Sequence, residues 1–201
     1  MSVRNLSEYR AQVAERRQAL SALLGTRVGP ANRVVWEVGS GHGHFLTAYA
    51  AAHPEQTCIG VDIASDRVVR AQRKCKRAKL NNLHFFLAEA DDFLAAAPAD
   101  LRFSAVFVLF PDPWPKRRHH KNRLMNPAFL EAVAARAGEG TLLFFRTDHE
   151  PYYRHAAGVV AGSPAWMPTD SATLPFEEPT VFEKRADRHF TLVARRRGAP
   201  S

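Results

Sequence analysis

The sequence predicts an α/β fold: a doubly wound, mostly parallel sheet with helices on both faces and an antiparallel strand near its end. Short apolar runs rich in β-branched and aromatic residues alternate with longer stretches of helical periodicity, which is the pattern of strand–helix–strand units. The alternation becomes less regular over residues 163–180, a loop rich in Pro and Thr. One last apolar run follows this loop, and the irregularity favours an antiparallel late strand.

The first half of the chain is predicted to hold a leading helix and three strand–helix units. Residues 6–24 are loosely periodic in apolar residues, and Gly25, Gly29 and Pro30 end that helix. Apolar runs predict strands at 34–38, 58–61 and 83–87. Helical spacing predicts helices over 45–52, over a segment capped by Ser65 or Asp66 with apolar residues from Val68 to Ala78, and over 90–96.

The second half continues the alternation. Phe103–Leu109 is an apolar run that predicts a buried fourth strand. Pro127 suits the first position of a helix, which is expected to run to about Ala137. The remaining expected elements are a strand at 141–145, a helix from about 151 and a final strand at 190–194.

The composition predicts a globular cytoplasmic protein. A length of 201 residues favours one domain, residues 31–201, behind a helical leader of residues 1–30, and 46% hydrophobic residues are enough for a sizeable core. We expect no membrane span and no signal peptide, since no apolar run has the required length. Cys58 and Cys75 lack metal-ligand spacing and lie in apolar patterns, which fits buried thiols in a reducing compartment.

Positive charge is concentrated in three segments of the chain. The net charge of +8 favours a polyanionic partner. Seven cations lie between Arg67 and Lys79, five between Lys116 and Arg123, and three at 195–197. The Arg67–Lys79 run lies opposite an apolar stripe and is interpreted as a solvated helix face. The run from Lys116 to Arg123 directly follows a proline-rich loop and is the stronger candidate for phosphate contacts.

A glycine-rich loop with a preceding acid closes the first strand. Glu37 stands before Gly39, Gly41 and Gly43 in G-x-G-x-G spacing, which differs from the dinucleotide fingerprint G-x-G-x-x-G. A carboxylate here repels a pyrophosphate and attracts a ligand ammonium group. S-adenosylmethionine carries an ammonium and a sulfonium. Asp62 ends the second strand, where an acid can bind ribose hydroxyls, and Glu89 follows the third, near the expected adenine.

The segment Phe110-Pro-Asp-Pro-Trp-Pro-Lys116 follows the fourth strand. Its three prolines fix φ and remove three backbone donors, so neither strand nor helix can continue. The resulting stiff turn presents Asp112, Trp114 and Lys116 at a strand end, where open α/β sheets bind ligands. The alternative is an ordinary proline-rich connection whose Trp114 covers the core.

Together these segments resemble the bacterial tRNA (guanine-N7-)-methyltransferase family. The resemblance runs from about Val34 to Arg185, and its parts are the Glu37–Gly43 loop, Gly60-Val-Asp62, Phe110–Lys116 with Arg118, His119 and Lys121, Thr147–Tyr152 and Thr180-Val-Phe-Glu183. It implies a Rossmann-like class I methyltransferase with a seven-stranded sheet, which uses S-adenosylmethionine, releases S-adenosylhomocysteine and acts on tRNA as a monomer or homodimer.

The resemblance also implies roles for individual residues. Glu37, Asp62, Glu89 and Asp112 would contact S-adenosylmethionine. The tRNA contacts would come from Lys116, Asp148, Thr180, Val181, Phe182 and Glu183. Two features depart from the family: Glu89 stands where Asp is usual, and the short leader leaves fewer N-terminal residues to grip RNA.

The implied reaction needs little proton chemistry. N7 of guanine carries a lone pair and no proton, so methylation requires alignment rather than a general base. A carboxylate beside the purine stabilises the positive charge that develops there, and Asp112 is the first candidate for this catalytic role, with Asp148 second. Trp114 either packs beneath the loop, which we favour, or stacks on a base.

Other functions remain open at this point. They are a methyltransferase with a protein or small-molecule acceptor, a non-catalytic RNA-binding module on the same fold, and a nicotinamide oxidoreductase, which the glycine spacing disfavours. A metal site is not expected, because the His42-x-His44 and His119-His120 pairs lack partners at ligand spacing.

Overall fold

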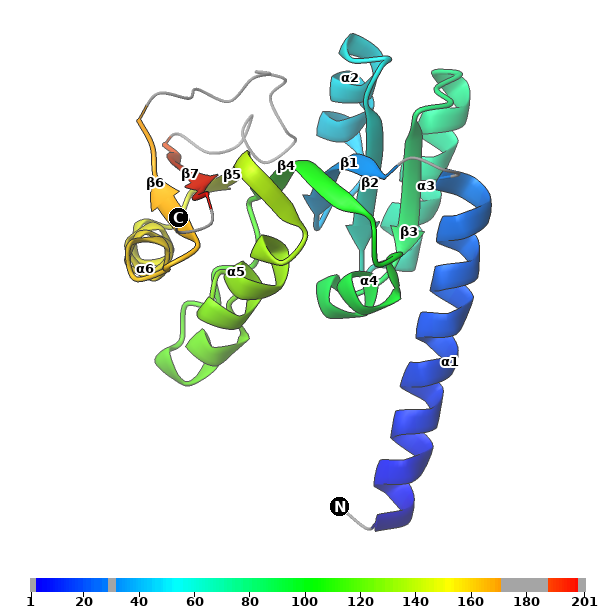
Figure 1. Ribbon diagram of the computed structural model, residues 1–201. Helices are drawn as coiled ribbons and strands as arrows, with labels where there is room; N and C mark the ends of the chain where they lie inside the picture. The colour runs from blue at the N-terminus through cyan, green and yellow to red at the C-terminus, as the bar shows by residue number, and fades with distance from the viewer. Residues whose placement is uncertain (1–2, 29–31, 171–187, 199–201) are drawn as a thin grey trace.

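The computed structural model describes residues 3–28, 32–170 and 188–198 (Figure 1). The strands are β1 (Arg33–Val38), β2 (Thr57–Asp62), β3 (Leu83–Leu87), β4 (Arg102–Leu109), β5 (Ala137–Thr147), β6 (Trp166–Pro168) and β7 (Phe190–Arg196). The helices are α1 (Val3–Val28), α2 (His44–Ala52), α3 (Ser65–Arg77), α4 (Ala90–Ala96), α5 (Pro127–Ala134) and α6 (Glu150–Ala161), with a 3₁₀ helix, η1 (Arg117–Asn122).

The strands form one seven-stranded sheet in the order β3-β2-β1-β4-β5-β7-β6. β1 to β5 are parallel neighbours, whereas β7 is antiparallel to both β5 and β6. The mostly parallel, doubly wound sheet and its antiparallel late strand are therefore confirmed. The winding reverses between β1 and β4, and open α/β sheets bind ligands outside the carboxyl ends of the strands at such a reversal.

Helices cover both faces of the sheet because side chains alternate along each strand. Val35 faces α2 and α3, and its neighbour Trp36 faces the core beneath α1, α4, α5 and α6. Trp36 is fully buried, and its ring stacks on Phe93 and Phe103 at centroid distances of 4.8 and 4.9 Å. This burial anchors β1 at the centre of the sheet and fixes the direction in which its end points.

The C-terminal part of the leading helix belongs to this core. Leu20 and Leu24 of α1 are buried, and Nε of Arg17 donates to Oδ1 of Asp92 in α4 at 2.7 Å. The other end of α1 projects past the remaining elements (Figure 1). The division into a leader of residues 1–30 and a domain of residues 31–201 stays a prediction.

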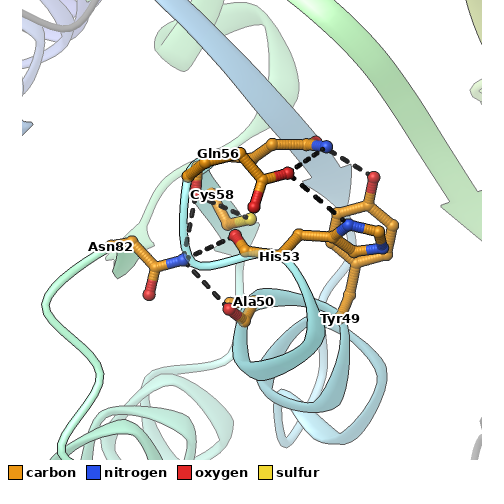
Figure 2. Close-up of polar contacts among 7 residues, drawn as sticks. Tyr49, Ala50, His53, Gln56, Cys58 and Asn82 are labelled. Carbon is orange, nitrogen blue, oxygen red and sulfur yellow. Dashed lines mark hydrogen bonds and ion pairs between the residues drawn. The ribbon is translucent and has the colours of Figure 1, made fainter.

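Asn82 ties three segments together at the edge where β2 and β3 begin. Its Nδ2 lies 3.0–3.1 Å from the carbonyl oxygens of Ala50, His53 and Gln56 (Figure 2). Its own carbonyl accepts from the amide of Cys58 at 2.7 Å. These bonds satisfy the end of α2 and set where β2 starts, and so where Asp62 ends it.

Four local predictions were wrong. Gly25 does not end the leading helix, because α1 continues through it to Val28. The expected loop at 163–180 contains β6, whose Trp166 is buried and donates from Nε1 to the carbonyl of Leu130 at 2.9 Å. The N-cap of α3 is Ala64, without a side-chain cap bond, in place of Ser65 or Asp66. The fifth helix ends at Ala134 rather than near Ala137, because the chain already enters β5 at Ala137.

Candidate functional site

Acidic side chains gather at the carboxyl ends of the five parallel strands β1 to β5. Glu37 is the second-to-last residue of β1 and Asp62 is the last residue of β2, and both are buried. Glu89, Asp112 and Asp148 follow β3, β4 and β5 and are exposed. Since these strands are neighbours in the sheet, the predicted site acids that the structure describes share one edge of the molecule.

Glu37 is a buried carboxyl without a full set of partners. Its side chain is 3% exposed, and Oε2 has no hydrogen-bond partner among the described residues. Burial, and secondarily the charge of Asp62, raise its pKa from 4.5 to about 8. A buried acid of this kind is costly for a protein to keep unless its charge is matched in use. The geometry therefore suits a positively charged ligand group at the end of β1.

Three residues of the glycine loop adopt the left-handed backbone conformation. Gly39, Gly41 and Gly43 have φ of +72°, +53° and +68°. A Cβ on Gly43 would lie 2.6 Å from the Phe85 ring and 2.8 Å from Cβ of Ala71, so only glycine fits where α2 packs on α3 and β3. A Cβ on Gly41 would meet nothing within 4 Å, so the space above the loop is open.

Asp62 organises that loop. Its Oδ2 accepts from the amide of Gly41, and its Oδ1 accepts from the amide of Ala64, both at 2.8 Å. The amides of Gly39 and Ser40 add bonds of 2.9 Å to the carbonyl of Val61. The carboxylate has lone pairs beyond those two bonds, but it also holds the loop in shape, which the sequence did not reveal.

An apolar recess lies beside Glu89. A cavity of about 550 Å³ between α1, α3 and the end of β3 is lined by Ile63, Leu87 and Glu89 among others. Ile63 directly follows Asp62 and is 74% exposed, and Leu87 is 55% exposed. Sequence reasoning missed Ile63, because an apolar residue after a strand resembles its continuation. Its exposure beside two acids marks it as a candidate contact for a flat apolar group.

The proline loop after β4 has an unusual backbone conformation. Phe110 and Trp114, on either side of Asp112, have positive φ of +51° and +44°. Such backbone strain in residues other than glycine is concentrated at functional sites. Oδ1 of Asp112 accepts from the amide of Trp114 at 3.0 Å, which closes a local turn. The half-buried Trp114 ring lies edge-on to His119 at 5.6 Å, in agreement with packing in the loop.

Arg123 is a structural support of this loop, and its prediction as a phosphate contact was wrong. It is only 2% exposed, and its Nε donates to the carbonyl of Pro113 at 2.9 Å. Its guanidinium lies over the ring of Tyr152 in α6, 4.9 Å from the centroid. The Tyr152 hydroxyl in turn accepts from the amide of Met125 at 3.1 Å. Arg123 thus connects the proline loop to α6.

Replacing Arg123 with Met is expected to lower the free energy of unfolding by about 2 kcal/mol, since it removes a desolvated cation–π contact and the donor to a loop carbonyl. Urea unfolding measures this change. Lys121→Met is the matched control: Lys121 is exposed in the same basic run, so its replacement should stay within roughly 0.5 kcal/mol of the parent. Equal stability of the two variants would contradict the supporting role of Arg123.

The predicted tRNA contacts are described only in part. Lys116, at the start of η1, and Asp148, between β5 and α6, are exposed. Arg117, Arg118 and Lys121 of η1 are exposed as well. Thr180, Val181, Phe182 and Glu183 lie outside the described residues. Within residues 3–28, 32–170 and 188–198, no cluster of three or more His, Cys, Asp or Glu side chains is arranged to hold a metal ion.

The part of the chain that the structure describes also contains no helix with the length and apolar character needed to cross a membrane. Solved structures of similar architecture include the aminoglycoside resistance methyltransferase NpmB1 (TM-score 0.58, 16% identity, 88% of this chain and 93% of that chain). Another is cofactor-bound Rv0187 from MTB (TM-score 0.61, 17% identity, 92% and 81%). At these identities the likeness shows the class I methyltransferase fold.

Sequence comparison is more specific than the fold. Residues 31–191 match the family model Methyltransf_4, described as "Putative methyltransferase". A tRNA (guanine-N(7)-)-methyltransferase of Chromohalobacter salexigens is 35% identical over 183 residues, 88% of this chain and 73% of the relative. Proteins of the same name from Stutzerimonas stutzeri and Alkalilimnicola ehrlichii are 37% and 33% identical and are covered to 66% and 65% of their length.

The chain thus spans about two thirds to three quarters of the length of these relatives, and the matched segment includes every described acid of the site. The family match and the identities to these relatives over most of the chain together show that it belongs to the tRNA (guanine-N(7)-)-methyltransferase family.

Proposed function

We propose that the protein transfers a methyl group from S-adenosylmethionine to N7 of a guanine in tRNA. The single observation that carries this proposal is Glu37, a buried and incompletely partnered carboxyl directly before the glycine loop, in a chain of this family. Glu37 sits beside β4, whose end leads into the Asp112 loop.

The residues at the strand ends fit this cofactor. The raised pKa of Glu37 indicates a carboxyl whose charge is unmatched, and the cofactor's ammonium group would match it. The open space above Gly41 admits a ligand close to the backbone. Asp62 would accept from the ribose hydroxyls, and the recess with Ile63 and Glu89 would take the adenine.

The chemistry follows from what the acceptor atom needs. The bound cofactor supplies a methyl group on a sulfonium sulfur. Because N7 of guanine has a free lone pair, the protein's task is to align the purine and to stabilise the positive charge that develops on it. The exposed Asp112, held by its bond to the Trp114 amide, presents its other oxygen for that purpose. Lys116, Arg117, Arg118 and Lys121 would hold phosphates and position the RNA.

The test is to incubate the protein with S-adenosylmethionine labelled in its methyl group and with unmodified tRNA, and then to map the modified base. Label at N7 of guanine is the expected result. N7-methylguanosine sites are cleaved selectively after mild reduction and aniline treatment, which locates the position. Label at another atom of tRNA, or transfer only to protein or small acceptors, would overturn the proposed reaction but leave the cofactor assignment standing.

A further inference from the structure

Helix α3 carries a dense and unneutralised row of cations. Six of its thirteen residues are basic: Arg67, Arg70, Arg73, Lys74, Lys76 and Arg77. Its one acid, Asp66, lies in the first turn. The helix forms because Val68 and Ala71 bury its opposite side against the sheet. Among the described residues, none of the six cations is within salt-bridge distance of a carboxylate.

The row borders a shallow, open hollow. Five of the cations, Arg70, Arg73, Lys74, Lys76 and Arg77, line a concave surface of about 680 Å³. His42 of the glycine loop and His44 at the start of α2 complete the lining, which includes no acid. We call this surface the basic hollow. Helices α2 and α3 lie side by side (Figure 1). Most of the lining comes from α3, and only His44 comes from α2.

The arrangement costs the protein stability on its own. Like charges three and four residues apart repel one another on a helix, and Arg70, Arg73, Lys74 and Arg77 are spaced in this way. Nζ of Lys74 is buried and has no hydrogen-bond partner among the described residues. Burial, and then the charge of Arg77, lower the pKa of Lys74 from 10.5 to about 8. A bound polyanion would offset the repulsion between these neighbouring cations, which no described carboxylate relieves.

The size and position of the hollow point to a nucleic acid strand. From Arg70 to Arg77 the helix rises about 10 Å, which is longer than a single phosphate and suits successive phosphates of one strand. The hollow starts at the glycine loop, directly after β1. The exposed cations of η1 follow β4, the neighbour of β1 in the sheet. A strand that enters the site between β1 and β4 would therefore meet basic side chains on both sides.

We propose that the basic hollow is a second binding surface for the phosphate backbone of the substrate tRNA, separate from the cations of η1. This inference rests on the proposed function, because it takes tRNA as the substrate. It reverses the interpretation of the Arg67–Lys79 run as a solvated face.

The test compares tRNA affinity at several salt concentrations. Arg73→Gln combined with Arg77→Gln should weaken tRNA binding by about 10-fold near physiological salt. The slope of log affinity against log salt concentration should fall by between about one and two units, because fewer counterions are released on binding when phosphate contacts are lost. The affinity for S-adenosylmethionine, measured by calorimetry, should not change. Arg73→Lys combined with Arg77→Lys keeps the charge and should keep most of the affinity and the slope.

The matched control removes the same charge elsewhere. Arg33 is the first residue of β1, and Arg195 of β7 pairs with Leu142 in the middle of β5, so neither lies at the carboxyl ends of the strands where the site acids gather. Arg33→Gln combined with Arg195→Gln should leave the slope within measurement error of the parent. If the Gln pair at α3 lost no more affinity than this control pair, the effect would come from net charge alone, and the proposal would be overturned. Equal losses for the Lys and Gln pairs at α3 would do so too, because charge would not be the cause.

The possible results also distinguish a failure of the basic-hollow proposal from a failure of the proposed methylation reaction. Unaltered tRNA binding by the Gln pair, with normal N7 methylation by the parent protein, would overturn the basic hollow alone. Binding through the hollow by a protein that methylates no guanine would overturn the proposed function and leave the surface standing.

Discussion

Asp112→Asn is expected to slow methyl transfer by ~10²-fold or more, because it removes the one charge that we place beside the developing positive charge on guanine. The amide oxygen of Asn can still accept from the Trp114 amide, so the turn closed by that 3.0 Å bond should persist. The two left-handed residues and three prolines around position 112 hold the loop as well. The loss should therefore appear in the single-turnover rate at saturating cofactor and tRNA.

Asp100→Asn provides a matched control for this substitution. Asp100 is an exposed aspartate just before β4, and Asp112 is an exposed aspartate just after it, so the two lie at opposite ends of one strand. The control should turn over at the parent rate, and both variants should keep the parent melting temperature. A rate for Asp112→Asn within a few-fold of the parent would exclude Asp112 from transition-state stabilisation. A loss in cofactor affinity alone would instead assign it to binding.

The sheet could be predicted because its strands are buried on both faces and are therefore continuous apolar runs. Val34–Val38, Cys58–Val61 and Phe103–Leu109 all lie within observed strands. β6 could not be predicted, because its three residues include Pro168 and it forms by pairing with β7. Pairing between segments distant in sequence leaves no local pattern. The N-cap of α3 was missed for a different reason: Ala64 has no capping side chain, and its amide is bound by the Asp62 carboxylate two residues earlier.

The site was predictable wherever side-chain chemistry and a strand end coincide. Glu37, Asp62 and Asp112 met that condition, and their common edge is confirmed by the sheet order. Charge alone was a poor guide, since burial decides what an arginine does. Arg123 continues the basic run of η1 but is buried against Tyr152, whereas the α3 cations that looked merely solvated line a hollow. The cofactor and tRNA contacts of these residues stay predictions.

Replacing Glu37 gives the second large expected effect, because its buried carboxyl lowers the free energy of unfolding and is expected to strengthen cofactor binding. In the unfolded chain its carboxyl loses a proton near pH 4.5, and in the folded, ligand-free protein it keeps the proton to about pH 8. Between these values the folded state holds more protons, so stability falls as pH rises, by up to about 1.4 kcal/mol per pH unit. Below pH 4.5 and above pH 8 this contribution is flat.

Glu37→Gln removes the titrating group and should flatten that part of the profile, so that the ligand-free variant is more stable than the parent by a few kcal/mol near pH 8. Thermal unfolding between pH 5 and pH 8 measures the difference. Glu131→Gln, an exposed position on α5, is the control and should follow the parent curve. Parallel curves for the parent and Glu37→Gln would show that Glu37 ionises freely in the folded protein.

The same carboxyl should link cofactor binding to proton release. At pH 6.5 Glu37 is mostly protonated in the free protein, and pairing with the cofactor's ammonium group favours the carboxylate, so S-adenosylmethionine binding should release close to one proton. Calorimetry in buffers of different ionisation enthalpy counts that proton. Glu37→Gln should abolish the release and weaken binding ~30-fold or more, the usual scale for losing one partner of a desolvated charge pair. Tight binding by the variant would mean that the ammonium group is held elsewhere. Because the stabilised variant should also be the poor binder, a loss of affinity there cannot be attributed to unfolding.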